Sequence, residues 1–184
     1  RDGISLVLVG QPNVGKSSLL NQLSGEDKAI VTDVPGTTRD AITSDISLNG
    51  ITLNIIDTAG LRDTDDPIEK FGIEKTWSSL EKGHMALFLV EANNGITDYE
   101  KSVLNRLPEH IKCIWVFNKI DLLKMEPKTV KRDGEHIVYI SAKTGEGLGL
   151  LKQVILNVVG FKENLEGSEN KFIARKRHLE ALEN

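Results

Sequence analysis

The chain of 184 residues, 39% hydrophobic and 27% charged, has the composition of a single globular domain that can bury a two-sided sheet. Its net charge of −4 argues against a domain that binds nucleic acid through its overall field. No run of about 18 apolar residues predicts a transmembrane helix, and no signal peptide opens the chain. The single cysteine, Cys113, lies in an apolar run typical of a core, so no internal disulfide forms and we expect a cytoplasmic protein without membrane contact.

The first half of the chain predicts a buried strand, a helix and a hairpin, in that order. Residues 4–9 form a short apolar run of the kind that makes a buried parallel strand, and residues 16–23 follow with a helical pattern. Residues 42–48 and 51–56 read as two strands, and the Asn-Gly pair at 49–50 suits a type I′ turn. We therefore expect an antiparallel strand at one edge of the sheet.

The second half alternates strands with helices. Buried strands are predicted at residues 85–90, 113–117 and 137–140. Helical patterns lie near residues 68–80, 99–107 and 147–159. This alternation implies βαβ units with right-handed crossovers. The fold class is therefore α/β, a three-layer α/β/α sandwich around a six-stranded, mostly parallel sheet with one antiparallel edge strand.

A change of composition near the C-terminal end divides the chain in two. Residues 1–160 contain every predicted strand and are expected to form one nucleotide-binding domain. Residues 161–170 are polar and contain glycine, as linkers do, and residues 172–182 have an amphipathic helical pattern. We expect residues 161–184 to be a linker and the start of a helical segment of a neighbouring domain, and the chain to be a fragment.

Residues 10–17 read G-Q-P-N-V-G-K-S and match the phosphate-binding pattern G-x-x-x-x-G-K-S/T, between a predicted strand and a predicted helix. In such a P-loop, successive backbone N–H groups converge on the phosphates at the helix N-terminus. Lys16 is expected at the β- and γ-phosphates, and Ser17 offers its hydroxyl to Mg²⁺. The predicted phosphate contacts are Asn13, Val14, Gly15, Lys16, Ser17 and Ser18. The fold is therefore predicted to be that of a P-loop NTPase.

A second motif, Asp57-Thr58-Ala59-Gly60, follows the strand predicted at 51–56. The Asp57 carboxylate can hold Mg²⁺ through a water, and the Gly60 amide can sense the γ-phosphate. We predict contacts to the nucleotide or its metal from Asp57, Thr58, Ala59 and Gly60.

Residues 36–40, G-T-T-R-D, lie between the first helix and the hairpin. A threonine in this place typically closes over Mg²⁺ and the γ-phosphate, and Thr38 is the predicted residue. The alternative is a plain capping or turn segment.

Residues 118–121 read N-K-I-D after a buried strand. The Asp121 carboxylate can accept both the N1–H and the exocyclic amine of guanine, which adenine does not offer. Sites of this kind favour the ligand that offers these donors over one that lacks them by a factor of about 10⁴–10⁵, so we expect the chain to bind GTP rather than ATP. The Lys119 stem can cover the base, and Asn118 can tie this loop to the P-loop. A backbone N–H for the guanine oxygen is expected from Ser141, Ala142 or Lys143. The alternative for residues 118–121 is a strand-ending turn.

The group that orients the attacking water is not identified by any motif. Leu61 stands where Ras-type enzymes carry a glutamine, and leucine cannot orient water. Arg39 and Arg62 are candidates for an arginine finger by proximity alone. An acidic run downstream supplies open candidates for the water-positioning group, namely Asp63, Asp65, Asp66, Glu69 and Glu74.

Several segments resemble the translation-associated GTPases of Era and EngA type, which have a Ras-like fold. Residues 11–21, Q-P-N-V-G-K-S-S-L-L-N, carry this general likeness. Residues 29–40, 57–62 and 68–74 are most similar to the family of MnmE (TrmE) tRNA modification GTPases. Residues 172–182 resemble the stretch where chains of that family re-enter a helical domain.

The resemblance implies a GTPase domain inserted in a larger protein. With a flavoprotein partner, that protein places an aminomethyl-type group on C5 of the wobble uridine of tRNA. The family's GTPase domains form a homodimer across their switch regions, where a K⁺ ion replaces the arginine finger. The implied K⁺ ligands are Asn13, Thr32, Val34 and Thr37. The predicted Mg²⁺ ligands are Ser17, Thr38 and Asp57. The implied catalytic residues are Lys16, Thr38 and Glu69, the last of which acts through a bridging water.

Two other interpretations stay open. An Era- or EngA-type ribosome-assembly switch would carry a KH-like RNA-binding module or a second GTPase domain after this one, whereas residues 172–182 favour a helical scaffold. A protein that binds nucleotide without turnover is disfavoured by the intact set of Lys16, Ser17, Thr38 and Asp57.

Overall fold

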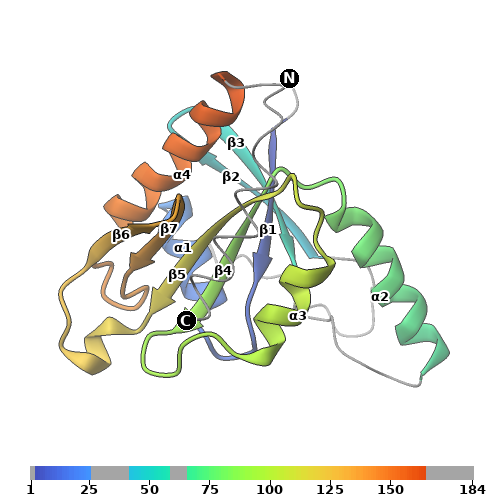
Figure 1. Ribbon diagram of the computed structural model, residues 1–184, viewed down its shortest axis with the longest axis horizontal. Helices are drawn as coiled ribbons and strands as arrows, with labels where there is room; N and C mark the ends of the chain where they lie inside the picture. The colour runs from blue at the N-terminus through green and yellow to red at the C-terminus, as the bar shows by residue number, and fades with distance from the viewer. Residues whose placement is uncertain (1–2, 26–41, 59–65, 165–184) are drawn as a thin grey trace.

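The computed structural model describes residues 3–25, 42–58 and 66–164, which fold into one seven-stranded sheet with helices on both faces (Figure 1). The strands are β1 (Ile4–Val9), β2 (Ile42–Leu48), β3 (Ile51–Asp57), β4 (Met85–Glu91), β5 (Lys112–Asn118), β6 (Lys128–Arg132) and β7 (Glu135–Tyr139). The helices are α1 (Lys16–Ser24), α2 (Pro67–Leu80), α3 (Asp98–Arg106) and α4 (Leu148–Asn164), with a 3₁₀ helix η1 (Ile120–Leu123). The strand order is β2-β3-β1-β4-β5-β7-β6.

The middle of the sheet is parallel and buried. β1 pairs in parallel with β3 and β4, and β5 pairs in parallel with β4 and β7. All of β4 except its last residue is buried, as its unbroken apolar run predicts. In the register of the sheet, Leu8 lies opposite Asp57 and Glu91 lies opposite Asn118. The residues that end or follow these strands therefore meet at one edge of the sheet.

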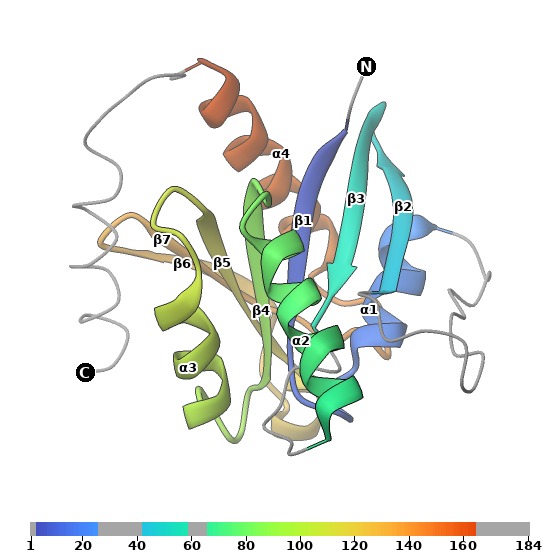
Figure 2. The same ribbon diagram turned by 90° about the vertical axis from the view of Figure 1, so that its right-hand side faces the viewer.

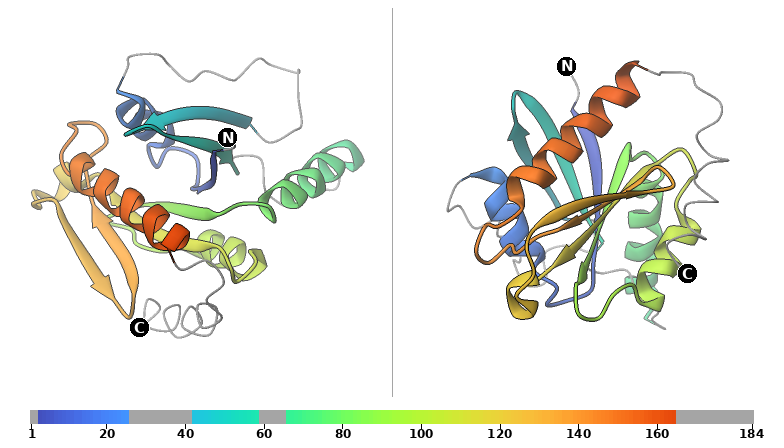
Figure 3. Two further views of the ribbon diagram at one scale, coloured as in Figure 1. Left: turned by 90° about the horizontal axis from the view of Figure 1, so that it is seen from above. Right: turned by 60° about the vertical axis from the view of Figure 1, so that its left-hand side comes forward.

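Side chains of the strands alternate between two cores, one on each face. In β1, Leu6 and Leu8 pack with α1 and α4, whereas Val7 and Val9 pack with α2 and α3. Figure 2 shows α2 and α3 in front of the sheet, and the right-hand view of Figure 3 brings α4 forward on the other face. The predicted three-layer α/β/α sandwich is confirmed.

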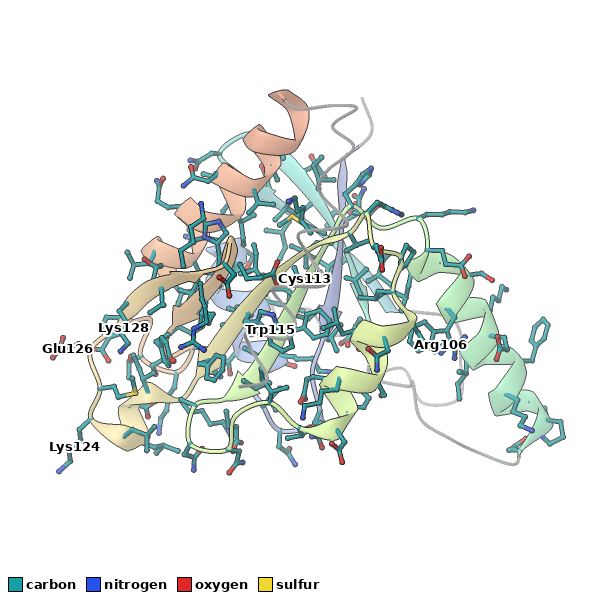
Figure 4. The ribbon with its side chains drawn as sticks, in the orientation of Figure 1. Arg106, Cys113, Trp115, Lys124, Glu126 and Lys128 are labelled. Carbon is teal, nitrogen blue, oxygen red and sulfur yellow. The ribbon has the colours of Figure 1, made fainter. Side chains whose placement is uncertain are left out.

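The core on the α2–α3 face contains the single cysteine (Figure 4). Cys113 and Trp115 on β5 are 5% and 1% exposed, and the Trp115 ring stacks on Phe88 with 4.6 Å between centroids. The Arg106 guanidinium lies 3.9 Å from the centre of the Trp77 ring, which joins the end of α3 to α2. The prediction that Cys113 is a core residue is confirmed.

Both edges of the sheet are antiparallel, so it has seven strands rather than six and a second antiparallel edge. The β2–β3 hairpin turns through Asn49 and Gly50 with φ of 51° and 85°, as predicted. Among the described strands, β6 pairs with β7 alone, across a turn in which Asp133 and Gly134 have φ of 53° and 86°. The sequence does not predict β6, because its mostly exposed, basic side chains give no hydrophobic run, as is common for an edge strand.

α4 is longer than its pattern predicts. It ends at Asn164 and includes residues 161–164, which the sequence assigns to a linker. These residues contain no proline, so nothing in their backbone stops the helix. The remaining linker and residues 172–182 lie outside the described residues, and the domain boundary at residue 160 stays a prediction. Within the described ranges, no helix combines the length and the hydropathy of a membrane span.

Candidate active site

The carboxyl ends of β1, β3, β4, β5 and β7 lie at one edge of the sheet, and the described residues that follow these strands lie there. The strand order places β3 on one side of β1 and β4 on the other. The chain therefore adds strands first on one side of β1 and then on its other side, which makes a topological switch point beside β1. A crevice at such a switch point is the usual ligand site of open α/β sheets.

The P-loop joins β1 to α1 and has the strand–loop–helix context that the motif requires. Asn13 and Gly15 have φ of 71° and 102°, and Gly15 is the N-cap of α1. A Cβ at residue 15 would collide with Asn118 Nδ2, so only glycine fits. The first turn of α1 has no acidic residue and no side-chain cap, so its amides can face an anion. Asn13, Ser17 and Ser18 are exposed, whereas the Val14 side chain is buried and can offer only its backbone.

Lys16 and Asp57 carry the charges on the phosphate side of the site. Lys16 Nζ donates to Asp57 Oδ1 at 3.0 Å, and their side chains are 11% and 16% exposed. Ser17 lies on the first turn of α1 beside Lys16. The Ser17 hydroxyl and the Asp57 carboxylate are the hard oxygen donors that Mg²⁺ prefers, so the residues present fit this metal.

Thr58 supports Asp57 from inside the protein. Its side chain is fully buried, and both its N–H and its hydroxyl donate to the backbone oxygen of Leu8 at 3.1 Å. Its own backbone oxygen accepts from the Tyr99 hydroxyl at 3.2 Å. The predicted contact of Thr58 with the nucleotide stays a prediction; the structure shows its N–H, hydroxyl and backbone oxygen bonded within the fold.

Tyr99 on α3 has a hydroxyl whose pKa is raised. Burial raises the pKa of Tyr99 above the ordinary value, a hydrogen bond with Thr58 lowers it, and the negative charges of Asp57 and Glu100 raise it further. The hydroxyl is therefore protonated at neutral pH and acts as the donor to Thr58. This ties α3 to the loop that begins at Asp57.

Asn118 connects the loop that is predicted to bind the base to two other loops. It is 2% exposed, its Nδ2 donates to the backbone oxygen of Val14 at 2.8 Å, and its Oδ1 accepts the N–H of Ala142 at 2.8 Å. The prediction that Asn118 ties this loop to the P-loop is confirmed.

Asp121 is oriented by the loop after β7. Its Oδ1 accepts from the hydroxyl of Ser141, a buried residue, at 2.9 Å. The backbone N–H groups of Ser141 and Ala142 donate to Glu146 and Asn118 respectively. The prediction that one of the amides of residues 141–143 meets the guanine oxygen stays a prediction, and the candidate is that of Lys143, which has no hydrogen-bond partner within the described part of the chain.

Three residues of the site were missed: Glu91 and Gln22 lie in no motif, and Gln11 fills an unspecified position of the P-loop pattern. Glu91 ends β4 and accepts from the Lys119 ammonium, and Gln22 on α1 donates to the backbone oxygen of Ala142 at 3.0 Å. Gln11 donates to the Thr97 hydroxyl at 2.8 Å, which links the P-loop to the N-cap of α3. The position of Glu91 at the carboxyl end of a buried strand is the one signal that could have found it.

The structure describes some of the residues that were predicted to take part in hydrolysis. Asp66 is the N-cap of α2, accepts the N–H of Ile68 at 2.9 Å and precedes Pro67 at the first helical position, so its carboxylate caps the helix. Glu69 lies on the first turn of α2, and Glu74 is exposed on the same helix. Predicted residues outside the described ranges are Thr32, Val34, Thr37, Thr38, Arg39, Ala59, Gly60, Leu61, Arg62, Asp63 and Asp65.

Comparison with known sequences gives matches to GTPases. A family model described as 50S ribosome-binding GTPase matches residues 5–119. The protein named tRNA modification GTPase MnmE of Nitrosomonas europaea is 47% identical over 182 residues, which is 99% of this chain and 40% of the relative. The protein of the same name from Legionella pneumophila strain Corby is 51% identical over 187 residues, again 40% of its length. The chain thus spans well under half of these relatives.

Solved structures give the same fold at lower identity. Aquifex aeolicus Era bound to GDP and AlF₄⁻ superposes with a TM-score of 0.63 at 29% identity, over 84% of this chain and 56% of that one. Era in complex with MgGDPNP and a segment of 16S ribosomal RNA also scores 0.63, at 27% identity and the same coverage. The cytosolic domain of the T. maritima FeoB iron transporter in a GDP form scores 0.61 at 26% identity, over 91% of this chain and 66% of that one. The predicted Ras-like P-loop fold is confirmed.

Proposed function

This chain belongs to the GTPase family described as 50S ribosome-binding GTPase and is a GTP hydrolase, and from that premise we propose that it is the GTPase domain of a tRNA modification protein of the MnmE type. The observation that carries the proposal is the identity of 45–51% to MnmE-named relatives along the whole chain. It is well above the 29% identity to Era. Because those relatives are longer than this chain, action on tRNA belongs to the complete protein.

The phosphates of GTP lie, in this proposal, against the P-loop amides and the Lys16 ammonium. Lys16 would leave its ion pair with Asp57 for the β- and γ-phosphates, and Mg²⁺ would be held by the Ser17 hydroxyl and, through a water, by the Asp57 carboxylate. When bound, the metal neutralises phosphate charge. Lys16 stabilises the charge that develops on the transferred phosphoryl group, and Thr38 completes the metal and γ-phosphate contacts.

The guanine ring lies against the loop that begins at Asn118. The Asp121 carboxylate accepts both guanine N–H groups, and its bond from Ser141 fixes the direction in which it points. The stem of Lys119 covers the base, and the Lys143 amide meets the guanine oxygen. Adenine would leave the Asp121 carboxylate without hydrogen-bond donors, and this cost explains the preference for GTP.

Glu69 positions the attacking water through a bridging water, and K⁺ takes the place of an arginine finger. Glu69 lies on the first turn of α2, a helix whose start is fixed by the Asp66 cap. Asn13 is an exposed residue of the P-loop with a neutral amide oxygen, a ligand suited to a weakly hydrated monovalent cation. The remaining K⁺ ligands proposed are Thr32, Val34 and Thr37.

The partner across the site is a second GTPase domain of the same kind. Ile68 and Phe71 lie one turn apart on α2, flank Glu69, and are 61% and 71% exposed. A dimer through the switch face buries such apolar side chains. In the complete protein we also propose a flavoprotein partner, C5 of the wobble uridine of tRNA as substrate, and a cytoplasmic location.

The hydrolytic proposal is tested by the GTPase rate per molecule in K⁺ and in Na⁺ at equal ionic strength, over a range of protein concentrations. The rate should rise with K⁺ and with protein concentration, because both the cation and the second domain complete the site. Equal rates in the two salts would remove the K⁺ claim, and a rate per molecule that does not change with protein concentration would remove the dimer claim; either result leaves the GTPase.

The tRNA proposal is tested in cells by Lys16→Ala in the full-length protein. Nucleoside mass spectrometry of total tRNA should show loss of a C5-modified wobble uridine. Unchanged tRNA would contradict the proposal.

A ribosome-binding switch is the second candidate, favoured by the description of the family model and by the Era complex with ribosomal RNA. Co-sedimentation of the full-length protein with ribosomal subunits, in the presence of GDPNP or GDP, distinguishes the two. Binding that depends on GDPNP would favour the switch.

A further inference from the structure

Glu91, a carboxylate outside the GTPase motifs, holds the lysine of the base-binding loop. Lys119 Nζ donates to Glu91 Oε2 at 2.5 Å and to the backbone oxygen of Asn13 at 2.7 Å. The Lys119 and Glu91 side chains are 30% and 22% exposed, so water screens the pair only in part. One ammonium thus joins the turn after β4, the loop after β5 and the P-loop.

Glu91 is itself fixed by the turn that follows it. Its Oε1 accepts from Asn94 Nδ2 at 2.8 Å, and its backbone oxygen accepts the N–H groups of Asn94 and Gly95 at 3.0 and 2.9 Å. The N–H of Ala92 donates to the backbone oxygen of Asn118 at 2.8 Å. An exposed ion pair is usually weak because two long side chains must be ordered, but here the carboxylate is ordered by its own turn.

The two residues that the ammonium connects both have left-handed backbones. Asn13 and Lys119 each have a φ of 71°. Residues other than glycine adopt this conformation at a cost in free energy, and they keep it where surrounding contacts support it. Charge-assisted hydrogen bonds from one ammonium provide such support to both loops at once.

We propose that Glu91 is a positioning residue for the guanine nucleotide. It holds the Lys119 ammonium against the Asn13 carbonyl, so that the Lys119 stem lies across the base pocket before the nucleotide arrives. The inference rests on the base pocket proposed above at residues 118–121. Glu91 acts through Lys119 alone and lengthens the residence time of GDP and GTP, while the association rate, set by encounter, changes little.

The test is the release rate of fluorescent N-methylanthraniloyl-GDP, measured by stopped flow on the full chain. Glu91→Gln keeps the shape and removes the charge, and release should become about fivefold faster. Glu126→Gln is the matched control, because Glu126 is an exposed carboxylate that points away from the sheet (Figure 4) and its loss should leave the rate unchanged.

A second pair of variants separates positioning from support of the fold. In the Lys119→Met background, Glu91→Gln should add nothing to the release rate, because the group through which it acts is gone. An unchanged rate for Glu91→Gln alone, or an equal increase in both backgrounds, would overturn the inference.

An Asp121→Asn arm separates this inference from the base pocket on which it rests. This variant should bind xanthosine diphosphate, and adding Glu91→Gln should speed release of that nucleotide by the same factor. If Asp121→Asn gains no xanthine binding, the base pocket is misplaced. If it gains binding but Glu91→Gln has no effect on release, the pocket stands and the role of Glu91 falls.

Discussion

The base side and the phosphate side of the site are built differently. On the predicted base side, Asn118, Lys119 and Asp121 form hydrogen bonds with the P-loop, the end of β4 and the loop after β7. On the predicted phosphate side, Lys16 forms an ion pair with Asp57. In our proposal the base pocket is therefore assembled before the nucleotide binds, whereas the phosphate side exchanges one ion pair for the ligand's charges.

The same contrast extends to the helix that carries Glu69. α2 is anchored at its C-terminal half, where Trp77 and Leu80 are buried, while Ile68 and Phe71 at its other end are exposed. This difference agrees with our proposal that guanine specificity resides in this domain alone and that hydrolysis needs a partner at the exposed end of α2.

Asp121→Asn should have the largest effect, on the base side. The amide accepts one guanine N–H and opposes the other, so the preference for GDP over xanthosine diphosphate should fall by about 10⁴. Competition titration of the two nucleotides measures the ratio. Asp45→Asn, at an exposed position of β2, is the control, and an unchanged ratio in Asp121→Asn would mean that the pocket lies elsewhere.

Glu69→Ala should act on the phosphate side alone. Turnover should fall by about 10²-fold or more, because a group that orients the attacking water is lost, while GDP affinity stays near wild type. Single-turnover hydrolysis and calorimetry give the two quantities. Glu74→Ala, on the exposed face of the same helix, should change neither; a large loss of affinity in Glu69→Ala would instead indicate a folding role.

Asn118→Ala should weaken both the pocket and the fold, because it leaves the Val14 oxygen and the Ala142 amide without their partner. We expect the free energy of unfolding to fall by about 3 kcal/mol and GDP affinity to fall by about 30-fold. Chemical denaturation and calorimetry measure these changes. A loss of affinity with unchanged stability would contradict the preassembled pocket.

Tyr99→Phe should have the smallest effect, about 1 kcal/mol in the free energy of unfolding, from loss of the bond to Thr58. Because the pKa of Tyr99 is raised on folding, its proton stabilises the folded state below pH 10 and that contribution is lost as pH rises through the folded pKa. Ultraviolet titration of the phenol should place its midpoint above the ordinary value of 10.0. A midpoint at or below that value would contradict burial of the hydroxyl.

The sequence predicts those parts of the site that are contiguous in the chain. Lys16 and Asn118 lie in short motifs at strand ends, and parallel strands bring such ends together whatever the details of packing. Glu91, Gln22 and Tyr99 are single residues that reach the site by register or helix packing, so no local pattern marks them. β6 was missed for the same reason, because a basic edge strand is defined by its partner rather than by its own hydrophobicity.

Titration calorimetry with GDP and with ADP, each in the presence of Mg²⁺, is the decisive test of guanine specificity. Only guanine satisfies the proposed contacts of the Asp121 carboxylate, so GDP should bind with measurable heat and ADP at least about 10³-fold more weakly. Equal heats and affinities for the two nucleotides, or no heat with GDP, would contradict it.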